Sequence, residues 1–200
     1  YDNDGDLDLF IGATIGTSKF FQNNGNGTFQ DITSLTGINI NDQVRGCSWF
    51  DYNQDGYLDL YIGLLYEPNL LYKNNGDGTF IDIAQNVGAT GPIGAGIIMG
   101  LGAIDYNRDG YQDLYITQDN YNGNILLKNE NGSFFTDVSY SSQTDLEVMG
   151  MGIAFGDINK DGLFDFYTTN LNENSLLLNS NNGVFSDISS TSETQDMLGS

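Results

Sequence analysis

Several residue types on which protein chemistry often depends are absent or scarce in this 200-residue sequence. It contains no histidine, which excludes a Ser–His–Asp triad, a Cys–His dyad and histidine-ligated zinc or iron. Its single cysteine, Cys47, excludes an internal disulfide and a cysteine-cluster metal site. The sequence also has no apolar run approaching the roughly 18 residues that a membrane-spanning helix requires.

Basic residues are scarce as well. Lys and Arg together number 6 against 27 Asp and Glu, which gives a formal net charge of −21. Such a charge repels phosphate backbones and anionic lipids, so nucleic acid and an anionic membrane surface are excluded as partners. A hydrophobic share of 39% still supplies enough apolar surface for a core, so the chain is not a disordered acidic tail. The partners that this charge favours are cations.

An Asp-rich pattern occurs four times and divides the chain into repeats. The copies are YDNDGDLDLFIG from Tyr1, DYNQDGYLDLYIG from Asp51, DYNRDGYQDLYIT from Asp105 and DINKDGLFDFYTT from Asp157. The steps between the last three copies are 54 and 52 residues. A second pattern, rich in Asn and Gly, follows each copy at a fixed offset, as in YKNNGDGTFIDI. The predicted units are 1–45, 46–97, 98–149 and 150–200 of one repeat domain.

Each unit contains four short segments of strand character separated by turn residues. In the second unit these segments are 46–50, 58–64, 69–73 and 79–83, filled mainly with Tyr, Phe, Ile and Leu. Repeated four-stranded units of about 50 residues are typical of β-propeller blades. Small residues in the first segment fit innermost strands that crowd around an axis. The sequence therefore predicts an all-β, propeller-type array of four units, each with about four antiparallel strands.

The complete Asp-rich loop reads Asp-x-Asn-x-Asp-Gly-x-x-Asp. Oxygen ligands at alternate positions of a tight loop converge on one point, and the Gly permits the backbone reversal that this requires. We expect the side chains at positions one, three, five and nine to ligate a metal. Position seven varies chemically, so we expect it to contribute its backbone carbonyl. Hard oxygen ligands without nitrogen or sulfur select Ca²⁺.

The loop has two other interpretations. An EF-hand requires Glu at the twelfth position and flanking helices, whereas this loop has Ile or Thr there, inside a predicted strand. A solvated turn is the second interpretation, because Asp and Asn both favour turns. Four copies that keep the same ligand spacing favour calcium binding over a turn alone.

These motifs resemble the FG-GAP/VCBS repeat family, which includes integrin α-subunit propellers. The resemblance rests on DYNQDGYLDLYIG, YKNNGDGTFIDI and GMGIAFGD, and it covers essentially the whole chain. It implies a calcium-bearing β-propeller that is secreted or displayed on a cell surface, with seven or eight blades in most members. Up to four Ca²⁺ ions would then be held by Asp51, Asn53, Asp55, Tyr57 and Asp59; Asp105, Asn107, Asp109, Tyr111 and Asp113; Asp157, Asn159, Asp161, Leu163 and Asp165; and Asp2, Asp4, Asp6 and Asp8. The loop that contains Asp2, Asp4, Asp6 and Asp8 lacks the first-position ligand.

The function that we expect is a non-enzymatic extracellular scaffold for adhesion or for recognition of a protein or glycan ligand. Two alternatives stay open: a structural subunit of an extracellular filament or tandem array that binds further copies of itself, and the propeller domain of a polysaccharide-cleaving enzyme. Because the sequence begins inside a motif and Met197–Ser200 resemble the start of an inner strand, we expect a piece of a larger protein or assembly. A larger propeller, a closed four-bladed ring and a long array all fit.

Other recurring residues have structural interpretations. Tyr61, Tyr115 and Tyr167 occupy equivalent strand positions, so we expect them in the core rather than in a sugar-binding platform. Cys47 lies among the small residues of a predicted inner strand, so we expect a buried thiol. One Asp follows each Asn-Gly turn, which favours a structural role over a catalytic one; these are Asp31, Asp82, Asp137 and Asp187.

Overall fold

The computed structural model describes residues 1–91 and 96–194 of the chain. In this part of the chain, 15 strands form four separate antiparallel sheets, which we number 1 to 4 in chain order. Within each sheet, strands that are consecutive in the sequence pair with one another. The predicted all-β array of four units is confirmed.

The strand boundaries follow the repeat. Sheet 1 contains β1 (Leu9–Ile11), β2 (Lys19–Asn23) and β3 (Phe29–Asp31). Sheet 2 contains β4 (Val44–Phe50), β5 (Asp59–Leu64), β6 (Leu70–Asn74) and β7 (Phe80–Asp82). Sheet 3 contains β8 (Ile97–Ile104), β9 (Asp113–Asp119), β10 (Ile125–Asn129) and β11 (Phe135–Asp137). Sheet 4 contains β12 (Gly150–Gly156), β13 (Asp165–Asn170), β14 (Ser175–Asn179) and β15 (Phe185–Asp187).

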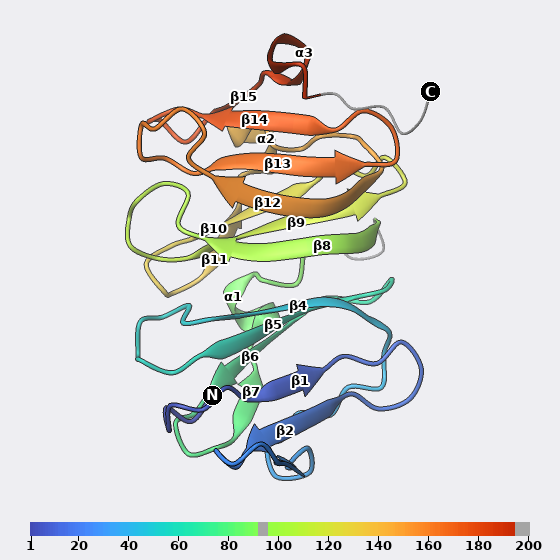
Figure 1. Cartoon of the computed structure of the whole chain (residues 1–200), viewed down its shortest axis with the longest axis vertical. Helices are drawn as coiled ribbons and strands as arrows, with labels where there is room; N and C mark the ends of the chain where they lie inside the picture. Colours follow the sequence, from blue (N-terminus) through green and yellow to red (C-terminus); the bar gives the residue numbers. More distant parts are fainter. Residues whose placement is uncertain (92–95, 195–200) are drawn as a thin grey trace.

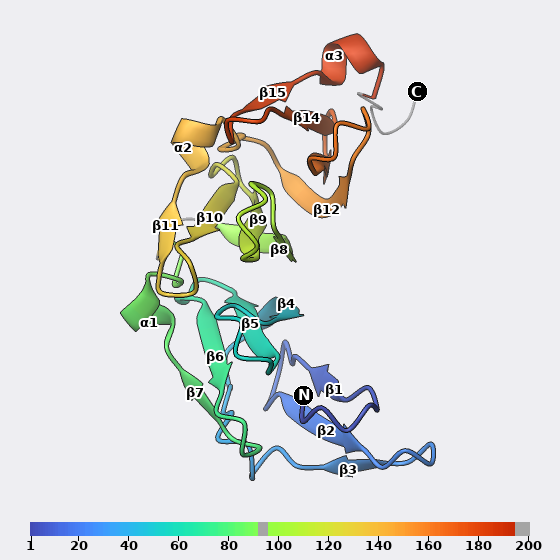
Figure 2. The ribbon, with the colours of Figure 1, turned by 90° about the vertical axis from the view of Figure 1, so that its left-hand side faces the viewer.

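The four sheets stack face to face in chain order and form an open arc (Figures 1 and 2). Sheets 1 and 4 lie at opposite ends of the stack, so the described residues do not form the closed four-bladed ring. The innermost strands β4, β8 and β12 pack side by side along the arc. The predicted inner strand at Met197–Ser200 lies outside the described residues.

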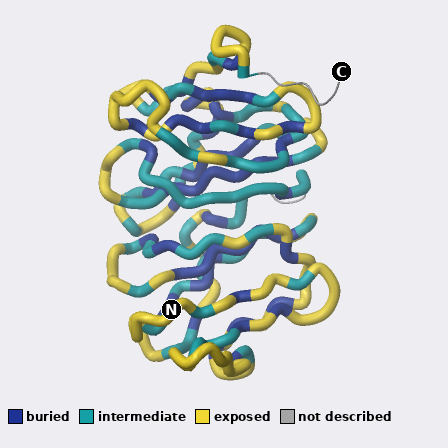
Figure 3. The backbone as a smooth tube through the Cα atoms, in the orientation of Figure 1, coloured by how far each residue is buried: buried dark blue, intermediate teal, exposed yellow. Residues whose placement is uncertain are grey.

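Apolar side chains fill the spaces between adjacent sheets. One cluster joins sheets 1 and 2 around Phe20 and Phe80, a second joins sheets 2 and 3 around Phe50 and Ile116, and a third joins sheets 3 and 4 around Phe166. Strand β5 is buried along its whole length because neighbouring sheets cover both of its faces. In Figure 3 the buried residues lie along the strands and the exposed residues lie mainly at the turns.

Glycine in the innermost strands permits close approach of neighbouring backbones. A Cβ atom placed on Gly100 in β8 would lie 2.9 Å from the backbone oxygen of Met151 in β12. No side chain fits there without moving one of the two strands. Gly100 therefore has the packing role that the sequence predicts for small residues of an inner strand.

Two features differ from the sequence analysis. Cys47 is exposed, so the prediction of a buried thiol is wrong. Among the described residues, sheet 1 has three strands and offers no counterpart of β4 to cover the face of β4 on which Cys47 lies. The fourth strands of sheets 2, 3 and 4 also lead into short helices that periodicity did not reveal: α1 (Ala84–Val87), α2 (Ser139–Ser142) and α3 (Ser189–Ser192).

None of the helices in the described part of the chain has the length and apolar character needed to cross a bilayer. Each of the three contains four residues.

Candidate metal centres

Each Asp-rich loop leads into the second-strand position of its sheet. Loop 2 (51–59), loop 3 (105–113) and loop 4 (157–165) join the first and second strands of sheets 2, 3 and 4. Loop 1 (1–8) precedes β1. At the base of each complete loop, equivalent residues of the first and second strands are paired. These pairs are Phe50 with Asp59, Ile104 with Asp113 and Gly156 with Asp165. The three complete loops therefore place nine equivalent positions at the same end of the strands in sheets 2, 3 and 4.

In loop 2 the first, third and fifth residues turn their oxygen atoms toward the loop interior. Asp51 Oδ1 and Asn53 Oδ1 both accept a hydrogen bond from the backbone N–H of Asp55, each at 3.1 Å. Asp51 Oδ2 accepts from the N–H of Gly56 at 2.9 Å. Asp55 Oδ1 accepts from the N–H of Tyr57 at 3.1 Å. Sharing one N–H brings the first and third side-chain oxygens close together.

Two left-handed residues produce this tight loop. Gln54 at position four has φ of 59° and Gly56 at position six has φ of 88°. Glycine adopts the second of these conformations without a steric penalty, which explains its recurrence in all four loops. The positive φ at position four recurs as well, at Asn3, Arg108 and Lys160.

Loops 3 and 4 repeat the same hydrogen bonds. Asp105 accepts from the N–H of Asp109 at 3.2 Å and of Gly110 at 3.0 Å. The equivalent bonds of Asp157 in loop 4 are 3.1 and 2.8 Å long. Asn107 Oδ1 at the third position also accepts from the N–H of Asp109, and Asn159 Oδ1 also accepts from the N–H of Asp161. Three complete copies of the predicted ligand set thus have one geometry.

The ninth-position Asp is buried and fastens the loop to the sheet. Asp59 Oδ2 accepts from the N–H of Tyr52 at 3.1 Å, and its Oδ1 accepts from the N–H of Asn74 at 2.8 Å. Asp113 and Asp165 make the equivalent pairs of bonds. The loop start and the end of the third strand are therefore joined through one carboxylate.

Burial opposes the negative charge of these groups. It raises the pKa of Asp59 and of Asp113 to about 7, although two backbone N–H groups at each carboxylate act in the opposite direction. Among the described residues, neither carboxylate has an ion-pair partner within 4.0 Å. A nearby cation would favour the ionised form of both groups.

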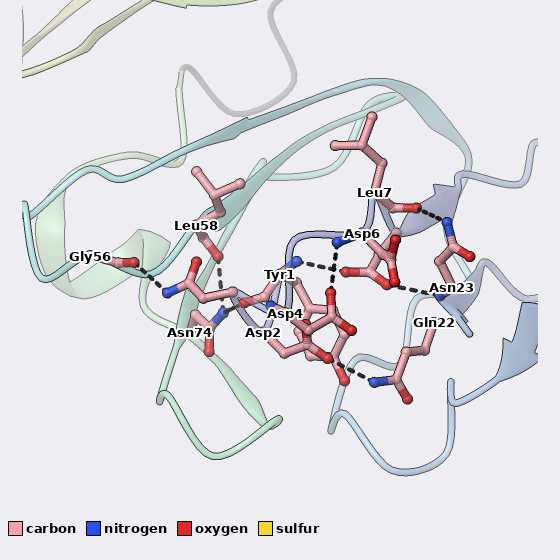
Figure 4. Close-up of polar contacts among 12 residues, drawn as sticks. Tyr1, Asp2, Asp4, Asp6, Leu7, Gln22, Asn23, Gly56, Leu58 and Asn74 are labelled. Atoms are coloured by element: carbon pink, nitrogen blue, oxygen red, sulfur yellow. Dashed lines mark hydrogen bonds and ion pairs between the residues drawn. The ribbon is translucent and has the colours of Figure 1, made fainter. Parts of the chain in front are cut away.

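Loop 1 is joined to its sheet in the same way as the other loops (Figure 4). The backbone nitrogen of Tyr1 lies 2.7 Å from Asp8 Oδ2, the contact that the N–H of Tyr52 makes with Asp59 Oδ2 in loop 2. Asp2 accepts from Gln22 Nε2 at 2.7 Å, and Asp4 accepts from the N–H of Asp6 at 2.9 Å. Loop 1 therefore keeps the third, fifth and ninth acidic positions without the first.

The seventh-position side chains point away from the loop interior. A Cβ atom placed on Gly76 would lie 2.9 Å from the Tyr57 ring, so this ring covers the Asn-Gly hairpin of sheet 2. The Tyr111 ring covers Gly132 in the same way. Asp6 approaches Gly25 of sheet 1. This placement leaves the backbone carbonyl as the group that position seven can offer a metal.

The carboxylates alone do not form a ready cage. Over 1–91 and 96–194, no group of three or more His, Cys, Asp or Glu side chains is arranged to hold a metal ion. The loop oxygens instead come from carboxylates, Asn side-chain amides and peptide carbonyls. This donor set fits Ca²⁺, which accepts six to eight oxygen ligands in flexible geometry, and it does not fit a metal that prefers nitrogen or sulfur.

The recurring Asp after each hairpin has a local structural role. The Oδ1 atoms of Asp31, Asp82, Asp137 and Asp187 each accept the backbone N–H two residues later, at 2.9 to 3.0 Å. Tyr61 and Tyr115 are fully buried, as predicted. Tyr167 is partly buried.

Hydrogen bonds between neighbouring loops are a feature that the sequence alone does not predict. The fourth-position side chain donates to the backbone oxygen of the sixth-position Gly in the next loop along the arc. These bonds run from Asn3 Nδ2 to Gly56 at 2.9 Å, from Gln54 Nε2 to Gly110 at 2.7 Å and from Arg108 Nε to Gly162 at 2.8 Å. The signal was present as a polar donor at position four of every copy (Asn3, Gln54, Arg108 and Lys160).

A known family model matches three successive stretches of the chain. A model of the FG-GAP-like repeat matches residues 1–62, 64–116 and 105–168. Cartilage acidic protein 1 of Xenopus tropicalis is 28% identical over 170 residues, which are 79% of this chain and 26% of that protein. Its human counterpart is 33% identical over 94 residues, 47% of this chain and 14% of that protein. The chain thus spans about a quarter or less of the length of these relatives.

Two solved structures align with most of the chain at low identity. The Tc holotoxin pore of Photorhabdus luminescens aligns with 93% of this chain and 9% of its own, at 16% identity and a TM-score of 0.43. An Agrocybe aegerita lectin that recognises non-reducing terminal N-acetylglucosamine aligns with 90% of this chain and 64% of its own, at 15% identity and a TM-score of 0.38. Both TM-scores are too low to inform the function of this chain.

Proposed function

The chain belongs to the FG-GAP-like repeat family, and from this premise we propose that it is a calcium-binding extracellular scaffold that acts by adhesion or recognition rather than by catalysis. The observation that carries the proposal is that loops 2, 3 and 4 share the same ligand types and the same hydrogen-bond geometry. Each presents a first-position carboxylate, a third-position amide and a fifth-position carboxylate around one shared N–H group. A solvated turn does not require the same three side-chain types at the same positions in every copy.

Calcium would be held in each complete loop by the side chains of positions one, three, five and nine and by the carbonyl of position seven. In loop 2 these are Asp51, Asn53, Asp55, Asp59 and Tyr57. Bound Ca²⁺ supplies positive charge to a cluster of three carboxylates that repel one another at short range. In loop 1 the corresponding groups are the side chains of Asp2, Asp4 and Asp8 and the backbone carbonyl of Asp6.

An extracellular location fits the ion and the composition. Extracellular modules bind Ca²⁺ with Kd values of about 10⁻⁴–10⁻³ M, which suits partly exposed loops of this kind. Four ions would reduce the formal charge from −21 to −13. The match to cartilage acidic protein 1 supports the same assignment. The proposed partners are a protein or a glycan, with further copies of the chain as an alternative.

Catalysis is the less favoured alternative. The loop carboxylates accept hydrogen bonds from backbone N–H groups of their own loops. The sequence has no histidine to act as a general base. A polysaccharide-cleaving enzyme would need Tyr, Lys or an Asp outside the loops for that role. Turnover in a screen of acidic and neutral polysaccharides would replace this proposal with an enzymatic one.

Calcium titration by isothermal calorimetry tests the metal assignment. We expect at least three ions per chain, with one ion lost in each of the variants Asp55→Asn, Asp109→Asn and Asp161→Asn. Asp42→Asn is the matched control, because Asp42 is an exposed carboxylate outside the loops. Absence of a binding isotherm at millimolar calcium, or equal loss in the control, would refute the assignment.

A further inference from the structure

The fourth-position side chains lie between two candidate calcium loops. Gln54 stands in the chain between Asn53 and Asp55, two proposed ligands of loop 2. Its own backbone is held in the left-handed region by the turn of that loop, with φ of 59°. Its side-chain Nε2 donates at 2.7 Å to the backbone oxygen of Gly110 in loop 3. A change in the conformation of loop 2 therefore moves a group that is bonded to loop 3.

The accepting peptide group leads directly to a ligand of the second loop. The carbonyl of Gly110 and the N–H of Tyr111 belong to the same planar peptide unit. That N–H donates to Asp109 Oδ1 at 2.9 Å. A donor at the carbonyl polarises the peptide and strengthens the bond that its N–H makes on the other side. One peptide plane thus connects Gln54 of loop 2 with the fifth-position carboxylate of loop 3.

The same connection recurs between loops 3 and 4. Arg108 Nε donates to the oxygen of Gly162 at 2.8 Å, and its Nη2 donates to the oxygen of Asp161 at 3.2 Å. The N–H of Leu163, in the same peptide unit as the Gly162 carbonyl, donates to Asp161 Oδ1 at 2.8 Å. A Cβ atom on Gly162 would collide with Arg108, so glycine at this position also admits the guanidinium.

A third copy links loops 1 and 2. Asn3 Nδ2 donates to the oxygen of Gly56 at 2.9 Å, and the N–H of Tyr57 donates to Asp55 Oδ1 at 3.1 Å. Three different side chains, an Asn, a Gln and an Arg, thus make the same contact with the next loop. What they share is an N–H donor of sufficient reach at position four.

We propose that Asn3, Gln54 and Arg108 are positioning residues that couple calcium binding in adjacent loops, so that occupation of one loop raises the affinity of the next. This proposal rests on the proposed calcium binding. Because coupling between sites is reciprocal, occupation of the later loop raises the affinity of the earlier one by the same factor. A factor of about five corresponds to the net free energy of one hydrogen bond, roughly 1 kcal/mol.

The test follows each loop separately in a calcium titration by ¹H–¹⁵N NMR, using the amide signals of Gly56, Gly110 and Gly162. Disabling loop 2 with Asp55→Asn should lower the calcium affinity of loop 3 about fivefold. In a Gln54→Met background, which keeps side-chain length without a donor, Asp55→Asn should have no further effect on loop 3. Arg108→Met should likewise uncouple loop 3 from loop 4, and Arg108→Gln, which keeps an N–H donor, should restore most of the coupling.

Lys160 supplies the matched control. It occupies position four of loop 4 with the same positive φ of 63°, and it has no hydrogen-bond or ion-pair partner among the described residues. Lys160→Met should leave the calcium affinities of loops 2 and 3 unchanged. An effect of Asp55→Asn on loop 3 that is equally large with and without the Gln54 amide would overturn the coupling, as would no effect at all. Absence of calcium binding in the unmodified chain would instead refute the proposed function.

Discussion

The side-chain amide of Asn129, at the end of β10 in sheet 3, donates from Nδ2 to the backbone carbonyl of Tyr52 in loop 2 at 2.8 Å. The same Nδ2 also donates to the carbonyl of Gln112 in loop 3 at 3.1 Å. Asn74 and Asn179 make the equivalent contacts with Tyr1 and Tyr106, at 2.9 and 2.8 Å. Each later sheet therefore holds the loop before it, while the position-four side chains reach in the opposite direction.

Replacing Asn129 should therefore weaken the junction between sheets 2 and 3. Asn129→Ala removes the donor for two backbone carbonyls and the acceptor for the N–H of Gly132, in a buried site. We expect a loss of about 1–3 kcal/mol in the free energy of unfolding, measured by urea denaturation. Asn86→Ala is the control, because Asn86 is exposed in α1, and its change should stay within about 0.5 kcal/mol. Equal effects of the two substitutions would contradict this role.

The buried hydroxyl of Tyr61 should contribute measurably to stability. It donates to the backbone oxygen of Ala89 and accepts from Asn69 Nδ2, both at 2.9 Å. Tyr61→Phe leaves these two buried groups without their partner, so we expect a loss of about 1–3 kcal/mol in unfolding free energy. The repeat-equivalent Tyr167→Phe should cost less, because that hydroxyl is in a partly buried residue and its bond to Thr194 is 3.5 Å long. The reverse order of the two losses would be inconsistent with the structure.

Gly100 and Gly156 provide a matched pair in the inner strands. A Cβ atom on Gly100 would lie 2.9 Å from the Met151 oxygen, whereas one on Gly156 would meet nothing within 4 Å. Gly100→Ala must separate β8 from β12 and should cost about 1–3 kcal/mol. Gly156→Ala should leave the unfolding free energy within about 0.5 kcal/mol of its original value. Thermal and urea denaturation of both variants would check this difference.

The repeat pattern made much of the fold predictable. Segments 46–50, 58–64, 69–73 and 79–83 of the second unit correspond to β4–β7 within two residues at each end. Alternate polar positions and the sixth-position Gly predicted the loop geometry, because a tight turn leaves few conformations for Asp-x-Asn-x-Asp-Gly. The resemblance to the FG-GAP repeat family is confirmed by the match of the family model.

Other features depended on contacts that one repeat does not reveal. Cys47 is exposed although its small neighbours in β4 predict burial, because burial of that side chain depends on a neighbouring sheet and sheet 1 has three strands among the described residues. The helices α1–α3 contain four residues each, too few for helical periodicity to appear. The bond from Gln54 to Gly110 joins residues 56 positions apart, so it emerges only when the loops are placed side by side.

If the loops bind calcium, the stability of the fold depends on calcium, and a thermal melt with and without chelator measures this dependence. A ligand that binds only the folded state adds about 2.7 kcal/mol per site at a free concentration one hundred times Kd. For a chain of this size, 1 kcal/mol shifts Tm by about 2–4 °C. We predict that EDTA lowers Tm by about 5 °C or more, that excess calcium restores it, and that elemental analysis detects calcium in the untreated protein. An unchanged Tm in EDTA, together with no calcium by elemental analysis, would contradict the account.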